Sequence, residues 1–485
     1  MSQSPPLMRF ASPNERRTIS REDLGFYNAL IVGAVYEVAS SEIDLQLPEA
    51  FIAPLKACIF KYPFLSVIVK NKHTEKPAYH EVPTLDLQEH ISIIQNDNLD
   101  SDDTTNFERV LPQILDRPWP ADIPPWRIVI LPLASTVKST ASRCLIIFSF
   151  SHTIGDGMVG VAFHRTFLEA WRQNVGSDGE QSCLVSLSGR TLPAPFDTPE
   201  RLTISWKFLL GPLIAVYLPN FLAEMLGLHA HASTVDAGTW TGSRAFFDPA
   251  VTNPSRVKML EIETPLLQNS LQISRKHDTK FTATFHQMIV RALSKAISNP
   301  SVTNFVSGTA VDMRRSIGLA SLSWGLYVSG HYDVHKRPGN VESSAVLDEM
   351  WTHASSMTKK LAECSTRLHD QAIGLLRYAP SIRNWTLGKL GGERDCSYEV
   401  SNLLAFDDAR SEKDQNYNIS KMIFSQPANV PSAPLVFNLI SVKGGSLICT
   451  VSWQSGALGV PTEEEMPFVD GICSSIRADF ESLQD

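Results

Sequence analysis

The stretch Cys144-Leu-Ile-Ile-Phe-Ser-Phe-Ser-His-Thr-Ile-Gly-Asp-Gly157 joins the most apolar short run of the chain to a histidine motif. A short run of large apolar residues predicts a buried β-strand over 144–150. The motif, His152-x-x-x-Asp156-Gly157, would then stand at the end of that strand, a rigid place from which to aim a side chain. Because an unperturbed histidine has a pKa of about 6.5, we expect His152 to serve as a base near neutral pH.

Length and composition describe a globular protein with more than one core. The chain has 485 residues, of which 43% are hydrophobic and 19% charged, and a single core rarely grows to that length. A net charge of −8 argues against a nucleic-acid binder, which usually carries a basic face. The seven cysteines include no C-x-x-C pair, so we expect neither disulfides nor a metal site, but reduced thiols in a cytoplasmic protein.

Two segments bear on targeting. The first twenty residues are polar and lack the apolar run of a secretory signal. Residues 204–228 are long enough to span a bilayer, but Lys207, Glu224, Pro212 and Pro219 interrupt them. We therefore expect buried or lid helices at 204–228, with loose membrane contact as the alternative.

The two halves of the chain predict a similar order of elements, which favours an α/β fold of two similar lobes, each a mixed sheet flanked by helices. The predicted elements are a helix over 48–60, strands over 64–69, 126–131 and 144–150 and a helix over 158–171, then a strand over 257–262, a helix over 284–297, a strand over 304–311, a hairpin of 435–442 with 447–453 and a helix over 464–483. We divide the chain into a first lobe (1–183), a crossover with apolar helices (184–241) and a second lobe (242–485). The second-half turn 452–456 offers no histidine, so only the first lobe carries a base.

A dinucleotide fingerprint overlaps the histidine motif. Residues 155–160 read G-x-G-x-x-G between a strand and a helix, but no second strand ending in an acidic residue follows at the expected distance. A lone match of this motif is weak evidence. Of the other histidines, we expect His164 to be hydrogen-bonded inside the protein and His286 to be solvated on the polar flank of its helix.

Taken together, these residues resemble the chloramphenicol-acetyltransferase-like superfamily, which includes BAHD acyltransferases, condensation domains and alcohol acetyltransferases. The nearest resemblance is to fungal alcohol acetyltransferase-type enzymes of secondary metabolism. Besides the histidine motif, it rests on Leu55–Val69, on Val311-Asp-Met-Arg-Arg315 and on Ser401-Asn402-Leu403. The chain departs from condensation domains at Ser151, where they carry a second histidine, and at Ser66, where they carry an arginine. It also lacks the D-F-G-W-G segment of BAHD enzymes.

The resemblance implies acyl transfer from a thioester to a hydroxyl or amine, with the site between the lobes and His152 as general base. Asp156 and Gly157 would be structural; Arg314 is a candidate partner of Asp156, and Asp312, Ser401 and Asn402 are candidates to line the site. Acetyl-CoA or another acyl-CoA would be the co-substrate of a monomeric enzyme without a bound cofactor or metal, and a small alcohol or amine the acceptor. Two alternatives stay open, a condensation-like enzyme that takes its donor from a carrier protein and a non-catalytic binding protein.

Overall fold

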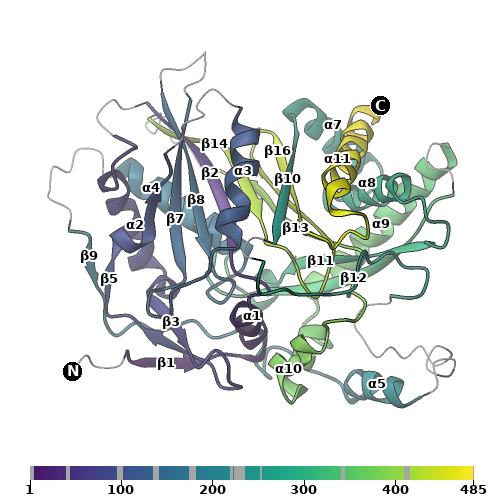
Figure 1. The fold of residues 1–485 in the computed structure, drawn as a ribbon, viewed down its shortest axis with the longest axis horizontal. Helices are drawn as coiled ribbons and strands as arrows, with labels where there is room; N and C mark the ends of the chain where they lie inside the picture. Colours follow the sequence, from purple (N-terminus) through teal and green to yellow (C-terminus); the bar gives the residue numbers. More distant parts are fainter. Residues whose placement is uncertain are drawn as a thin grey trace.

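Two large β-sheets stand side by side, one built mainly from each half of the chain (Figure 1). The computed structural model describes residues 5–39, 44–95, 102–134, 141–173, 182–218, 222, 225, 235–251, 254–339, 344–408 and 416–483. The helices are α1 (Pro13–Asp23), α2 (Glu49–Lys61), α3 (Asp103–Leu115), α4 (Gly157–Gln173), α5 (Trp206–Tyr217), α7 (Thr264–Lys276), α8 (Phe281–Ala296), α9 (Ser344–Thr366), α10 (Ile382–Leu387) and α11 (Glu465–Ser482). The strands are β1 (Leu7–Phe10), β2 (Leu30–Val38), β3 (Val67–Lys70), β4 (Ala78–Glu81), β5 (Thr84–Asp86), β6 (Ile91–Ile93), β7 (Trp126–Leu133), β8 (Ser142–Phe150), β9 (Leu184–Ser186), β10 (Ser255–Ile262), β11 (Asn304–Asp312), β12 (Val328–Lys336), β13 (Tyr398–Phe406), β14 (Tyr417–Ser425), β15 (Leu435–Val442) and β16 (Leu447–Gln454).

Strand β8, which precedes the histidine motif, lies at the centre of the first sheet. The order of strands is β14-β2-β8-β7-β6, and β8 pairs antiparallel with both β2 and β7. Every residue from Cys144 to Phe150 is buried. The prediction of a buried strand over 144–150 is therefore confirmed, and the motif begins where this rigid strand ends.

The last strand of the first sheet comes from the second half of the chain. Strand β14 pairs antiparallel with β2, with Ser425 opposite Ile31 and Tyr417 opposite Val38. Its residues Met422 and Phe424 belong to the same apolar core as β2 and β8. The two halves are thus interleaved, and the division at 183 and 241 stays a prediction from the sequence.

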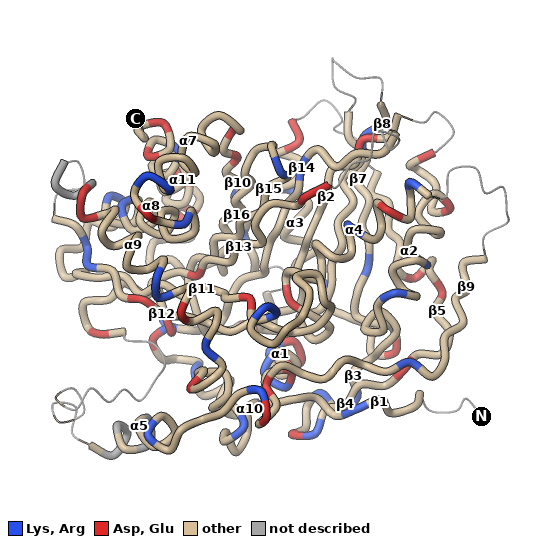
Figure 2. The backbone as a smooth tube through the Cα atoms, turned by 180° about the vertical axis from the view of Figure 1, so that it is seen from behind, with Lys and Arg blue, Asp and Glu red and all other residues tan. Residues whose placement is uncertain are grey.

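The second sheet has the order β10-β16-β15-β13-β11-β12, with α7, α8, α9 and α11 gathered on its outer side (Figure 1). The predicted hairpin is confirmed, because β15 and β16 pair antiparallel with Leu435 opposite Trp453. A further apolar core joins the two sheets, because Val257 and Ile448 of the second sheet pack with Ile31 and Ile147 of the first. Acidic and basic residues are interspersed along both halves of the backbone (Figure 2).

Two local expectations are wrong. The strand predicted over 64–69 begins only at Val67, because Pro63–Ser66 form a short 3₁₀ helix that proline, which lacks an N–H, can start. His286 is fully buried rather than solvated. Its ring nitrogens lie 3.1 Å from the Tyr398 hydroxyl and 3.1 Å from Thr309 Oγ1, and α9 and α11 both pack against its helix.

His164 is buried and hydrogen-bonded, as the sequence predicts. Its Nε2 donates to the Val32 carbonyl at 2.9 Å, which leaves Nδ1 to accept from the Tyr36 hydroxyl at 2.9 Å. All seven cysteines are free, and only Cys183 is partly exposed. None of the helices in the described residues is long and apolar enough to cross a membrane; of the segment 204–228, residues 219–221, 223–224 and 226–228 lie outside the described residues.

We expect the fold to lose stability as the pH falls from 6.5 toward 5. Burial lowers the pKa of His90, His164 and His335 to about 4, so the unfolded chain takes up protons in a pH range where the folded protein does not. Each such histidine contributes a slope of up to about 1.4 kcal/mol per pH unit, present above pH 6.5 and lost as the pH falls.

Urea denaturation at pH 7, 6 and 5 measures this dependence, and the midpoint should fall at each step. The variant His164→Gln supplies a control. Burial lowers the pKa of His152 and His286 as well, so this variant removes one of at least five such protons and should reduce the slope by about a fifth or less. A midpoint that stays constant from pH 7 to pH 5 would contradict the prediction.

Candidate active site

His152 stands on a tight turn between β8 and α4. The turn is fixed at its start by a hydrogen bond from the Ser151 N–H to the Pro125 carbonyl, at 2.8 Å. His152 Nδ1 lies 2.8 Å from the Gly155 carbonyl oxygen. Because a carbonyl only accepts, Nδ1 must carry the hydrogen, which leaves the lone pair on Nε2. The turn thus presents Nε2 as the basic atom, and the side chain is only partly buried.

The surroundings of His152 keep its ring neutral. Burial lowers the pKa of His152 to about 3; the positive charge of Arg17 contributes to this shift, followed by that of Arg21, and the bond to Gly155 opposes it. Near neutral pH the imidazole is therefore unprotonated and able to accept a proton.

The ring of Tyr27 packs beside the ring of His152. The two rings lie 5.7 Å apart at an interplanar angle of 38°. The Tyr27 hydroxyl donates to Gln426 Oε1 at 2.6 Å, and the Arg21 guanidinium lies 4.7 Å from the Tyr27 ring centroid. This hydrogen bond therefore joins the segment after α1 to the segment after β14, although the two are far apart in the sequence.

Asp156 is paired with Arg314, deep in the protein. Arg314 Nη2 donates to Asp156 Oδ1 at 2.8 Å, and the two side chains are 1% and 6% exposed. The other carboxylate oxygen accepts from the Tyr327 N–H at 2.9 Å, and Arg314 Nε donates to the Ser323 carbonyl at 2.8 Å. Asp156 therefore binds the histidine turn to residues 314–327 of the second half.

Two aromatic side chains bind two further carbonyls of the turn. Trp324 Nε1 donates to the Ile154 carbonyl at 2.8 Å, and the Tyr79 hydroxyl donates to the Thr153 carbonyl at 2.7 Å. Since buried backbone groups are costly when unpaired, these bonds favour one conformation of the turn.

The glycines of the motif are explained by close packing. A Cβ at Gly157 would lie 2.7 Å from Leu403 Cδ2 on β13, and one at Gly160 would lie 2.3 Å from Val32 Cγ2 on β2. The missing side chains let the start of α4 approach both sheets. The glycine pattern 155–160 thus has a packing explanation that involves no nucleotide.

We expect Gly157→Ala to lower the free energy of unfolding by about 1–3 kcal/mol, because the added methyl group overpacks the contact with Leu403. Urea denaturation of the single and double variants measures this loss of unfolding free energy. In the background Leu403→Ala, which removes the clashing carbons, the same substitution should cost at least about 1 kcal/mol less. An equal cost in both backgrounds would contradict this account of Gly157.

The other predicted residues lie around the turn at different distances from it. Asp312 Oδ1 pairs with Arg314 Nη1 at 2.9 Å but is half-exposed. Asn402 Nδ2 donates to Thr282 Oγ1 at 3.0 Å, and Ser401 precedes it on β13. Both stand within two residues of Leu403, which contacts Gly157. The structure thus gathers Asp156, Gly157 and Arg314 directly, and brings β13 against the same turn.

Sequence reasoning missed the contribution of the N-terminal helix. The charges of Arg17 and Arg21 on α1 lower the pKa of His152, and Tyr27, four residues after this helix, packs beside its ring, yet no motif in the sequence marks any of the three. One signal was present: Ser12-x-x-Glu15 forms a capping box in the structure and marks the start of α1. It would have predicted the helix, though not its place beside the histidine.

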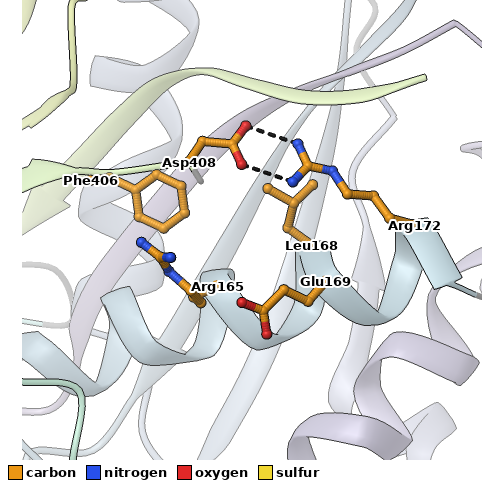
Figure 3. Close-up of a pocket in the computed structure, with 6 residues that line it drawn as sticks. All are labelled: Arg165, Leu168, Glu169, Arg172, Phe406 and Asp408. Carbon is orange, nitrogen blue, oxygen red and sulfur yellow. Dashed lines mark hydrogen bonds and ion pairs between the residues drawn. The ribbon is translucent and has the colours of Figure 1, made fainter. Parts of the chain in front are cut away.

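A pocket lies further along α4 (Figure 3). It is lined by Arg165, Leu168, Glu169, Arg172, Phe406 and Asp408. Arg172 is held in a bidentate pair with Asp408 at 2.8 and 2.9 Å. The first α4 residue of the lining stands eight residues after Gly157, about 12 Å along the helix axis. This pocket is therefore separate from the histidine turn.

Comparison with known proteins now identifies the family. A family model described as alcohol acetyltransferase matches residues 19–474. The chain belongs to the alcohol acetyltransferase family. It is therefore an acyltransferase, and the resemblance seen in the histidine motif is confirmed at the level of the family.

Relatives of this acyltransferase match most of its length. An uncharacterised protein of Schizosaccharomyces pombe is 24% identical, with 90% of each chain covered. A probable alcohol acetyltransferase of Fusarium pseudograminearum is 22% identical over 85% of this chain and 82% of its own. The solved structure of TRI3 trichothecene 15-O-acetyltransferase from Fusarium sporotrichioides matches with a TM-score of 0.67 at 13% identity, with 99% of both chains covered. The last likeness confirms the predicted fold, mixed sheets flanked by helices in two lobes.

Proposed function

We propose that this acyltransferase moves an acetyl group from acetyl-CoA to the hydroxyl of a small molecule, with His152 as the general base. The observation that carries the proposal is the neutral imidazole at the end of β8, whose Nδ1 is occupied by the Gly155 carbonyl and whose Nε2 is left to accept a proton. General-base assistance of this kind contributes about 10²–10⁴-fold to a rate.

The reaction would proceed in one transfer. Nε2 takes the proton from the acceptor hydroxyl as the oxygen attacks the thioester carbonyl, so a C–O bond forms. The C–S bond then breaks, and the imidazolium returns its proton to the departing thiolate of CoA. Holding donor and acceptor together between the lobes would supply a larger share of the acceleration than the base does.

A covalent acyl-enzyme has no support in the described residues. The nearest hydroxyls in the sequence are those of Ser151 and Thr153, but Ser151 Oγ donates to Glu22 and the two hydroxyls lie 2.8 Å apart. Neither forms a hydrogen bond with His152. A nucleophile would need such a bond to be activated by this base.

Acetyl-CoA with a panel of small alcohols tests the proposal, with release of CoA thiol and formation of the ester as the two readouts. The same panel with an acetyl-loaded carrier protein tests the other donor. We expect turnover with acetyl-CoA by a monomer that works in the cytoplasm and needs no membrane. If only the carrier-bound donor supports turnover, the donor is a carrier-protein thioester and not acetyl-CoA.

A further inference from the structure

Two arginines on α1 border the histidine turn and take no part in the proposed reaction. Arg17 and Arg21 stand four residues apart and thus on one face of the helix. The next residue, Glu22, accepts a hydrogen bond from Ser151 Oγ, directly before His152. This bond holds that end of α1 against the turn, between the two halves of the molecule (Figure 1). The positive charges of both guanidiniums lower the pKa of His152.

Neither arginine is in contact with a carboxylate among the described residues. Arg17 donates only to the neutral Asn14 Oδ1, from Nε and Nη2 at 3.3 Å each. Arg21 donates to Asn429 Oδ1 through Nη2, and its Nε–H is buried without a partner. Both guanidiniums therefore have N–H groups free for a ligand.

One carboxylate lies at longer range, on the facing sheet. Glu399 on β13 accepts from Asn429 Nδ2 at 3.0 Å and also from Ser432 Oγ. Its charge opposes the effect of burial on Arg17, as do the hydroxyls of Tyr27 and Tyr332; burial still lowers the pKa of Arg17 to about 10. Two cations thus face one anion, which is already engaged by neutral donors. A desolvated cation without an ion-pair partner is costly unless a ligand supplies the missing charge.

We propose that Arg17 and Arg21 bind a carboxylate on the acceptor, so that the preferred acceptors of this enzyme are hydroxy acids. This inference rests on the proposed function, because it places the acceptor hydroxyl at His152 Nε2. The planar guanidinium fork matches a carboxylate through two parallel hydrogen bonds. The phosphates of CoA suit this position less well, because the pantetheine arm separates them from the thioester that must reach His152.

Such a carboxylate would also strengthen the base. The positive charges of Arg17 and Arg21 both lower the pKa of His152. An anion bound between them and the ring would offset those charges, so the histidine would become a better base when the acidic acceptor arrives. Recognition and catalysis would then be coupled at one position.

Matched pairs of acceptors test the inference: lactate, mandelate and para-(hydroxymethyl)benzoate, each against its methyl ester, with acetyl-CoA as donor. We expect kcat/KM to be higher for the acid than for its ester by about tenfold or more, the worth of charge-assisted hydrogen bonds. In Arg17→Met that ratio should fall by about tenfold, and the acidic limb of the pH profile for the ester should move to higher pH. The control is Arg16→Met on the same helix, where the side chain bonds to the Glu75 carbonyl at 3.2 Å; its ratio should equal that of the natural protein.

The outcomes separate this inference from the proposed function. His152-dependent transfer to the esters, without a preference for any acid, would overturn the inference and leave the function standing. So would a KM in Arg17→Met that rises for acetyl-CoA but not for acetyl-pantetheine, because the arginine would then bind the donor. The absence of His152-dependent transfer to every acid and ester would overturn both.

Discussion

Replacing His152 by alanine should lower kcat for acetyl transfer by about 10²–10⁴-fold while leaving the fold intact. The expected loss follows from the geometry: Nε2 is the basic atom that the turn presents, and the hydroxyls beside it are engaged elsewhere. Because Nδ1 bonds only to the Gly155 carbonyl within the same turn, its removal should disturb little beyond residues 151–156. Release of CoA thiol under saturating donor and acceptor measures the effect.

The matched control is His73→Ala, which removes an exposed histidine in the turn after β3. It should retain the turnover of the natural protein, and both variants should show its circular dichroism spectrum. Turnover within a few-fold of normal in His152→Ala would remove the histidine from the reaction.

Breaking the Asp156–Arg314 pair should cost about 3–5 kcal/mol of unfolding free energy, because removing one partner leaves the other charge buried. In Arg314→Met the Asp156 carboxylate would stay buried with its charge uncompensated. In Asp156→Asn the buried guanidinium would keep only its ion pair with the half-exposed Asp312. The double variant should cost less than the two single variants together, because it leaves neither charge alone. Urea denaturation of the four proteins completes the cycle.

The control for this cycle is Asp312→Asn. Asp312 contacts the same guanidinium at 2.9 Å, but its side chain is 43% exposed, so solvent screening should limit the loss to about 1 kcal/mol. Equal losses for Asp156→Asn and Asp312→Asn would show that burial of the pair is not what makes it stabilising.

Short-range patterns predicted several elements of the fold, including the strand before the motif. An unbroken apolar run identified β8, the period of apolar residues identified α8, and two glycines between apolar runs identified the hairpin of β15 and β16. Each of these signals lies within one element. The position of His152 at a strand end could therefore be derived from some fourteen residues.

Long-range pairing could not be derived in the same way. Asp156 and Arg314 are 158 residues apart, and nothing in the residues around either one specifies the other. The insertion of β14 beside β2 depends on which exposed edge the first sheet offers, a property of the assembled sheet. His286 was misjudged for a related reason, because its partners Thr309 and Tyr398 come from two other strands.

The same limit explains why the arginines of α1 were overlooked. A charged residue on a helix of unknown position is predicted to be solvated. The hydrogen bond from Ser151 to Glu22, which the sequence does not reveal, shows that this end of α1 lies against the histidine turn. The residue that we propose as the base is thus visible in the sequence, whereas the residues that we propose to bind the acceptor become visible only through tertiary contacts.

The central claim is that His152 drives acyl transfer from a CoA thioester to a small hydroxyl compound. Its most direct test incubates a fungal metabolite extract with the protein and an equal mixture of unlabelled and doubly ¹³C-labelled acetyl-CoA, followed by mass spectrometry. We expect a new product that appears as a pair of masses differing by the two heavy carbons, with the natural protein and with His73→Ala but not with His152→Ala. The same pair of masses at equal intensity with His152→Ala would contradict the account.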